Sequence, residues 1–270
     1  MVAIKCMLLT ETYDKSILED NTKYFQVKEN GVRAIVHILD GKIVGIRNRN
    51  GSPILYQFPE LKDISFPFNT GILDGEVCVF QEDRSVYYGG IDKRRSAPTE
   101  HTLKEFPATL VVFDALKIED EVLVMKPYKY RHELIGKNIG TFQNKYLKFA
   151  MNYTGKELWN EVVEKNFEGI VVKNPMAMYE LGKRSTQYIK LKNYKTTEIT
   201  VDKIEPNDKG TKIFGKVGEI EVECQLAGMF DVEVGSVQRI KYLDIVGNRL
   251  IQPTKVKREQ ITSNSTIVSK

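Results

Sequence analysis

Lys28, in VKENGVR, lies a short turn before the apolar run RAIVHIL, where a lysine could reach into a cleft. An unprotonated lysine amine can attack phosphorus and hold the product as a phosphoramidate, whereas arginine does not release its proton. Because an ordinary lysine pKa is about 10.4, a site that uses Lys28 at neutral pH must lower that pKa by about 2 to 3 units. In isolation, such a lysine is most often an exposed surface residue.

Two further lysines, Lys190 and Lys192, alternate in YIKLK. Residues two apart on a strand face the same side, so we expect both amines to lie together. Beside Lys28 they would lower its pKa and stabilise negative charge that develops on a phosphate. Without the other motifs, YIKLK is equally typical of an edge strand with exposed lysines.

Two glutamates and a phenylalanine adjoin other apolar runs. Glu76 lies in ILDGEV, Glu168 in FEGIVVK and Phe113 in VVFDAL. Carboxylate oxygens suit a magnesium ion that neutralises phosphate charge. Taken singly, each glutamate is typical of a solvated strand end, and Phe113 is typical of a hydrophobic core.

The elements that must position these residues are short strands and helices. Strands are predicted over 33–39, 75–80, 108–116 and 168–173, where runs rich in valine and isoleucine lie between polar turns. A helix is predicted over 154–166, capped by Thr154. Its buried face would hold the apolar residues spaced three or four apart, namely Leu158, Trp159, Val162 and Val163. The chain up to about residue 195 is therefore mixed α and β.

Beyond residue 196 the helical periodicity ends. EIEVECQL (219–226) alternates strictly, which predicts a half-exposed strand with Ile220, Val222, Cys224 and Leu226 inward. Three more segments, 198–204, 212–217 and 236–246, bring the prediction to about five short strands separated by glycines. A small barrel of the oligonucleotide-binding type is the natural closure for that number of strands.

Composition sets broad limits. With 270 residues and 41% hydrophobic residues, the chain is long enough for two domains. A net charge of +4 does not by itself indicate a nucleic-acid partner. Three widely spaced cysteines exclude a disulfide framework and a four-cysteine zinc site. With no signal peptide and no long apolar stretch, we expect a soluble, cytoplasmic protein without membrane partners, and a monomer.

The motifs follow one another in an order that resembles the covalent nucleotidyltransferase superfamily of ATP-dependent DNA ligases and capping enzymes. VKENGVR, LDGEV, VVFDAL, EGIVVK and YIKLK match its motifs I, III, IIIa, IV and V. RNRNG and FPEL, at 47–51 and 58–61, resemble the segment that DNA ligases carry between motifs I and III. The resemblance spans residues 5–260 and favours a minimal two-domain DNA ligase.

The resemblance implies an α+β fold in two domains. Residues 1–195 would form a nucleotidyltransferase domain, the ATP-grasp-like adenylation domain of DNA ligases, with two facing antiparallel sheets, helices outside and ATP between the sheets. Residues 196–262 would form an all-β OB-fold domain, and 263–270 a disordered tail. The extra DNA-encircling domain of large ligases would be missing. DNA would then be gripped by basic clusters such as 92–95 and 182–184.

The resemblance also implies a role for each candidate residue. Lys28 would carry AMP from ATP, aided by Lys190 and Lys192, in sealing 5′-phosphate/3′-hydroxyl nicks of duplex DNA during replication, repair or recombination. Nucleotide contacts would come from Gln26, Arg33, Glu76, Phe113, Lys173, Lys190 and Lys192, with Phe113 stacked on adenine and Lys173 on a phosphate. Glu76 and Glu168 would bind Mg²⁺, for which Mn²⁺ can substitute. Arg33 and Arg49 would contact DNA.

Two departures from the family pattern leave alternatives open. The family usually has aspartate where this chain has Asn30, and the basic motif VI is only loosely suggested by 253–259, with Lys257 and Arg258 as candidates. An RNA ligase is the alternative within the superfamily, ahead of a capping guanylyltransferase. A catalytically inactive nucleic-acid-binding module is the alternative from another class.

Overall fold

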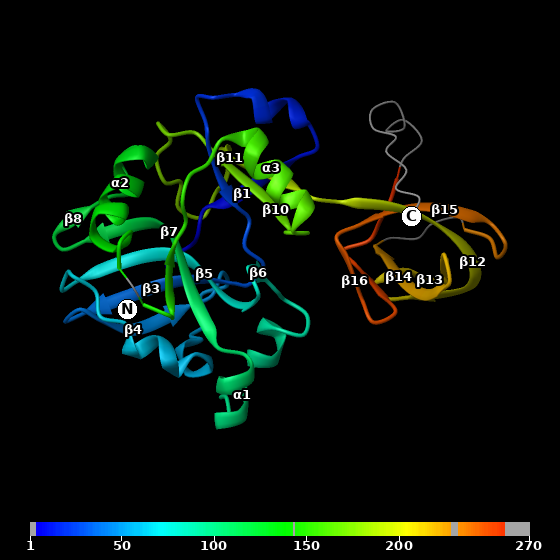
Figure 1. Cartoon of the computed structure of the whole chain (residues 1–270), viewed down its shortest axis with the longest axis horizontal. Helices are drawn as coiled ribbons and strands as arrows, with labels where there is room; N and C mark the ends of the chain where they lie inside the picture. The colour runs from blue at the N-terminus through cyan, green and yellow to red at the C-terminus, as the bar shows by residue number, and fades with distance from the viewer. Residues whose placement is uncertain (1–3, 143, 228–231, 257–270) are drawn as a thin grey trace. The chain divides into compact units, whose positions relative to one another are not determined.

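The computed structural model describes residues 4–142, 144–227 and 232–256. The chain divides into two compact units, Met1–Asn193 and Tyr194–Lys270 (Figure 1). The predicted tail at 263–270 and the motif VI candidates Lys257 and Arg258 lie outside the described residues. Every other candidate site residue belongs to the first unit, so the site can be built from that unit alone.

A large sheet forms the core of the first unit, with strand order β4-β3-β5-β7-β8, and with β6 on β5 and β9 on β7. The strands are β3 (Val32–Leu39), β4 (Lys42–Arg47), β5 (Gly71–Gln81), β6 (Arg84–Ser85), β7 (Ala108–Ile118), β8 (Glu121–Val122) and β9 (Leu147–Phe149). The central strands β5 and β7 are almost continuously buried, as their apolar sequences require. All pairings are antiparallel except β7 with β9, which corrects the expectation of a purely antiparallel sheet.

A smaller sheet completes the first unit, in the order β1-β11-β10-β2. Its strands are β1 (Leu8–Thr12), β2 (Tyr24–Val27), β10 (Gly169–Lys173) and β11 (Arg184–Lys192). Here too one pair, β1 with β11, is parallel rather than antiparallel. An apolar cluster that contains Ile35 of β3, Leu116 of β7 and Tyr188 of β11 ties this sheet to the large one.

The predicted helix is α3 (Gly155–Glu164), which packs on the small sheet. Leu158, Trp159 and Val162 are buried against Phe25 and Ile170, as expected. Val163 is 52% exposed, so its placement on the buried face was wrong. The three buried side chains already fill the contact stripe, and Val163 lies about a quarter-turn to its side.

Two helices were not predicted. The helix α2 (Tyr128–Ile139) lies against β7 and β9, whereas α1 (Glu100–Glu105) is a short segment whose N-cap Thr99 accepts a hydrogen bond from the Thr102 N–H at 3.2 Å. Short 3-10 helices join the strands: η1 (Lys15–Glu19), η2 (Leu55–Gln57), η3 (Pro59–Asp63) and η4 (Ile91–Arg94). Within the described part of the chain, no helix has the length and apolarity that crossing a membrane requires.

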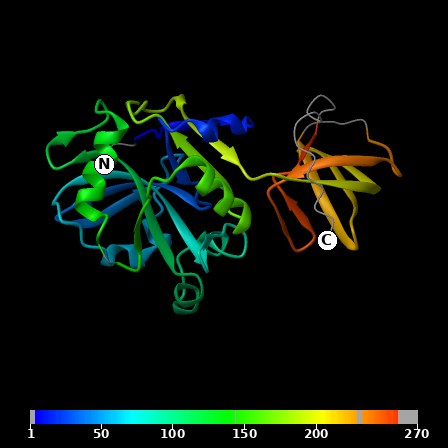
Figure 2. The ribbon, with the colours of Figure 1, turned by 45° about the horizontal axis from the view of Figure 1, so that its top comes forward.

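The second unit is a seven-stranded sheet in the order β16-β17-β14-β13-β12-β15-β18. Its strands are β12 (Lys195–Asn207), β13 (Gly210–Val217), β14 (Ile220–Ala227), β15 (Val237–Tyr242), β16 (Asp244–Val246), β17 (Arg249–Ile251) and β18 (Thr254–Lys255). The expected number of about five was therefore too low for the described residues: the predicted segment 236–246 forms both β15 and β16, and the short strands β17 and β18 were not predicted. The sheet of the second unit is strongly curved (Figure 2). As a result β14 contacts β18, although three strands separate them in the sheet order.

Alternation along β14 is confirmed for three of its four apolar residues. Val222, Cys224 and Leu226 are buried, whereas Ile220 is 52% exposed. Ile220 is the first residue after the β13–β14 turn and pairs with Val217, so it lies at the end of the hairpin, beyond the core.

Candidate active site

Lys28 lies directly after β2, in a loop that is fastened to the start of β10. Its backbone N–H donates to the Gly169 carbonyl at 2.9 Å, and its Nζ pairs with a Glu168 carboxylate oxygen at 2.8 Å. The Glu168 side chain is only 5% exposed. A Cβ on Gly31 would lie 2.2 Å from the Val77 carbonyl oxygen, so the loop can press against β5 only with glycine there. The fold thus brings together the lysine and the glutamate that the sequence singled out.

The large sheet supplies the opposite side of the site. Arg33 on β3 and Glu76 on β5 are directly paired in the strand register. The Arg33 guanidinium makes a bidentate ion pair with Asp74, with Nε and Nη2 distances of 2.5 and 2.6 Å, and its central carbon lies 4.8 Å from the centre of the Phe113 ring. Arg33 is therefore held in place by Asp74, and it faces the aromatic ring expected to bind adenine.

Charge interactions show that Glu76 shares this site with Lys28 and Glu168. Burial raises the pKa of Glu76 to about 7, the positive charges of Lys28 and Arg33 oppose that rise, and the negative charge of Glu168 adds to it. Carboxylates at Glu76 and Glu168 are the hard oxygen donors that suit Mg²⁺. Over the described residues, however, no group of three or more acidic, histidine or cysteine side chains forms a ready metal site.

Lys190 and Lys192 lie on β11 with the buried Leu191 between them, so both amines face the same side, as the alternation predicted. Lys190 pairs with Glu11 of β1 at 3.0 Å. Burial lowers the pKa of Lys192, and the charges of Lys190 and Lys28 lower it further, against Glu11 and Glu168. After the roles that the sequence analysis expects of them, we call Lys28, Glu76, Glu168, Lys190 and Lys192 the catalytic cluster.

Lys173 does not fit the expected contact with phosphate. The residue is 3% exposed, and its Nζ donates to the Tyr128 hydroxyl at 3.1 Å and to the Phe113 carbonyl at 3.3 Å. The amine also lies over the rings of Phe113, Tyr128 and Tyr188, at 4.8, 4.4 and 5.3 Å from their centres. Burial lowers the pKa of Lys173 to about 7. Lys173 therefore packs among the rings of Phe113, Tyr128 and Tyr188 and is not exposed to a phosphate.

Gln26 and Arg49 differ in how available they are. Gln26 is buried, and its Nε2 already contacts the Ala150 carbonyl at 2.9 Å and His132 Nε2 at 3.2 Å, so the adenine edge assigned to it would have to displace these partners. Arg49 is exposed in the turn after β4, as contact with DNA requires. Asn30 is fixed through its backbone, whose N–H donates to Ser85 Oγ at 2.9 Å.

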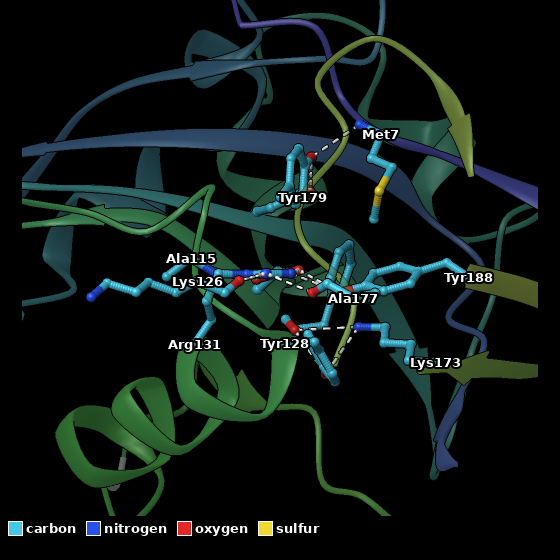
Figure 3. A network of polar contacts seen from close by, with 12 residues as sticks. Met7, Ala115, Lys126, Tyr128, Arg131, Lys173, Ala177, Tyr179 and Tyr188 are labelled. Atoms are coloured by element: carbon cyan, nitrogen blue, oxygen red, sulfur yellow. Dashed lines mark hydrogen bonds and ion pairs between the residues drawn. The ribbon is translucent and has the colours of Figure 1, made fainter. Parts of the chain in front are cut away.

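The sequence did not reveal the buried ionic groups that support the site. Arg131 of α2 makes a bidentate pair with Asp114 of β7 at 2.7 and 2.8 Å and donates to the Tyr188 hydroxyl at 2.7 Å. Figure 3 shows Arg131 together with its neighbours Lys126, Ala177 and Tyr188. Burial disfavours the charged form of Arg131, but the hydrogen bonds and charge of Asp114 outweigh it and raise its pKa. We call Asp114, Arg131 and Tyr188 the buried network.

One member of the basic cluster at 92–95 is structural. Arg94 is fully buried, pairs with Glu60 at 2.7 and 2.9 Å, and donates to the Phe106 and Gln57 carbonyls. It cannot grip a DNA phosphate, because the side chain is fully buried and both of its terminal nitrogens are already bound inside the core. For the buried network, the sequence does carry a signal. Asp114 lies within an apolar strand, and a buried carboxylate there needs a partner such as Arg131.

Comparison with solved structures gives the class of fold. The ligase domain of M. tuberculosis LigD has a TM-score of 0.62 at 16% identity, covering 95% of this chain and 96% of that one. At this level of identity the likeness establishes the fold alone, which is that of a DNA ligase catalytic region.

Sequence comparison then gives the family. The chain is 28% identical over 188 residues to the SPbeta prophage-derived DNA ligase-like protein LigB of Bacillus subtilis, covering 69% of this chain and 67% of that protein. It is 26% identical over 193 residues to the DNA ligase of Pyrobaculum calidifontis, covering 67% of this chain but only 33% of that ligase. A family model described as ATP dependent DNA ligase domain matches residues 2–192. The chain belongs to the ATP-dependent DNA ligase family.

Proposed function

We propose that the chain is an ATP-dependent DNA ligase that carries AMP on Lys28. The observation that supports this most is the convergence of Lys28 and Glu168 at 2.8 Å, from the loops next to β2 and β10, close to Lys192 of β11, which is paired with Gly169. In the first step Nζ of Lys28 attacks the α-phosphorus of ATP. An N–P bond forms, the P–O bond to pyrophosphate breaks, and the amine proton is released.

Two transfers at the nick follow. The 5′-phosphate at the nick attacks the phosphorus of lysyl-AMP, which frees the Lys28 amine and forms an adenylylated DNA end. The 3′-hydroxyl then attacks the DNA 5′-phosphorus, which forms the phosphodiester and releases AMP. Lys190 and Lys192 are the fixed positive charges that would stabilise the phosphates in these transfers.

Glu168 has a defined part in the first step. Its carboxylate pairs with the Lys28 amine at 2.8 Å and so holds it in place. The nucleophile forms when this contact opens and the proton leaves. Glu76 and Glu168 would hold a Mg²⁺ ion, or Mn²⁺ in its place, and such an ion would neutralise phosphate charge.

The second unit is proposed to be the OB-fold domain. Its curled sheet, in which the two distant strands β14 and β18 come close, supports a barrel of that type. It would add DNA contacts and the basic residues of motif VI. Phosphate contacts of this kind carry no sequence preference and weaken with salt.

The test supplies the wild-type protein with α-labelled ATP or GTP and Mg²⁺, and then with nicked DNA or nicked RNA. We expect label from ATP alone, its transfer to the 5′-phosphate of nicked DNA, and a sealed strand. Preferred joining of RNA would make the protein an RNA ligase. Labelling by GTP would indicate a capping enzyme, and no labelling at all would refute the proposal.

A further inference from the structure

A small hairpin outside the five motifs touches both loops of the catalytic cluster. β6 pairs with the end of β5, with Phe80 opposite Ser85 and Gln81 opposite Arg84. Ser85 is buried, and its Oγ accepts the Asn30 N–H at 2.9 Å. Ser85 therefore fixes the backbone two residues after Lys28.

The neighbouring residue of the hairpin reaches the second loop. Arg84 Nη1 donates to the Asn166 carbonyl at 3.3 Å, two residues before Glu168. Asn166 has a φ of 55°, the left-handed conformation that asparagine tolerates better than most residues, and it forms the turn that leads into Glu168. Asp83 of the same hairpin adds a weak contact to Lys165, at 3.8 Å. The large sheet thus holds both loops that belong to the small sheet.

We propose that the β5–β6 hairpin is a positioning clamp, which through Ser85 and Arg84 holds the loops of Lys28 and Glu168 in the geometry for attack on ATP. This inference rests on the proposed function. Two neighbouring points of the Lys28 loop are held from the large sheet: Asn30 by Ser85, and Gly31 by its close approach to the Val77 carbonyl. The Ser85 hydrogen bond thus fixes the backbone two residues after Lys28, and with it the position from which the lysine side chain reaches Glu168.

The clamp predicts a loss confined to the adenylylation step. Ser85→Ala should slow label incorporation at saturating ATP by about ten- to hundredfold, because small displacements of a reacting group cost that much. The KM for ATP should stay within about twofold, since Ser85 does not touch the nucleotide in this account. Ser85→Thr keeps the hydroxyl and should restore the rate. Arg84→Met should also slow labelling, through the loop of Glu168.

Sealing of a pre-adenylylated nick separates positioning from general damage. That step does not require attack by Lys28, so Ser85→Ala should seal such a nick at nearly the wild-type rate. The matched control is Glu82→Gln, an exposed change at the turn of the same hairpin, which should behave as the wild type does.

Three results would overturn the clamp. The first is normal labelling by both Ser85→Ala and Arg84→Met, and the second is failure of Ser85→Thr to recover the rate. The third is an equal loss of labelling and of pre-adenylylated sealing in Ser85→Ala, which would indicate a merely structural serine. If the wild type itself does not label, the proposed function fails and the clamp falls with it; if the wild type labels, only the clamp is at stake.

Discussion

The catalytic cluster and the buried network both contain paired charges, but the pairs differ in exposure and in the number of contacts that hold them. In the cluster, Lys28 keeps 20% of its side chain exposed and meets Glu168 through one amine contact. In the network, Arg131 is fully buried and its guanidinium is bound by Asp114, Tyr188 and two carbonyls. A single-point lysine contact can open during a reaction, whereas a bidentate buried arginine cannot open without unfolding its surroundings. The proposed nucleophile thus has a side-chain contact that can open, whereas Arg131 is bound on several sides at once.

The largest effect should come from removing the nucleophile while keeping its ion pair. Lys28→Arg retains a positive charge for Glu168 but cannot form a neutral amine, so labelling by ATP should fall to background, a loss of at least about a thousandfold. Lys28→Ala should lose labelling equally. Circular dichroism and Trp159 fluorescence should show a folded protein for both. Residual labelling in Lys28→Arg would mean that another residue carries the AMP.

The buried network should matter for stability first. Arg131→Ala leaves the Asp114 carboxylate buried without its cation, and should lower the free energy of unfolding by about 3 to 5 kcal/mol. Trp159, the single tryptophan and part of the first unit, reports this unfolding in urea. Lys156→Ala, which breaks an exposed pair with Glu19, is the control and should change stability little. If Arg131→Ala and Lys156→Ala lowered the free energy of unfolding equally, the buried pair would be no more important for stability than an exposed one.

Lys173 provides a pH test of the rigid region. Its pKa falls from 10.5 in the ordinary state to about 7 in the folded protein because of burial. Between these pH values Lys173 binds more protons in the unfolded chain than in the folded protein. Its contribution to the free energy of unfolding therefore rises with pH through this window and is constant below about pH 7. Relative to Lys173→Met, the wild type should therefore gain up to about 1.4 kcal/mol per pH unit between pH 7 and 9. Parallel stability curves for the two proteins would show that Lys173 is not buried in this way; the exposed Lys183→Met should give a parallel curve.

The smallest effect should come from Asn30→Asp. A carboxylate two residues from Lys28 favours the protonated amine, so the pH profile of labelling should shift upward by less than about one unit, or the Mg²⁺ requirement should fall. The Asn30 backbone contact with Ser85 should be kept, so activity should remain. Superimposable profiles at several Mg²⁺ concentrations would make Asn30 a turn residue only.

Much of the catalytic cluster could be predicted from the sequence because its residues adjoin strongly apolar strands. Lys190 and Lys192 follow from strict alternation around Leu191, and Lys28 and Glu168 follow from the motif order. The pairing of Lys28 with Glu168 could not be predicted, because it depends on how β2 and β10 align.

The buried network was missed for a physical reason. The inward face of α2 carries Arg131 and His132 among its apolar residues, so the hydrophobic period that identifies a helix is interrupted. Those polar residues are buried only because partners from distant strands, such as Asp114, satisfy them. The burial of Lys173 was not predicted either, since a lysine that ends a motif gives no local sign of the aromatic rings that surround it.

Lys28 is proposed to carry AMP, and no other lysine of the first unit is. The most direct measurement is tandem mass spectrometry of proteolytic peptides, after the wild-type protein has been incubated with ATP and Mg²⁺ without DNA. The account predicts an AMP adduct on Lys28 that disappears when nicked DNA is added. An adduct on Lys173, Lys190 or Lys192 instead, or no adduct at all, would contradict it.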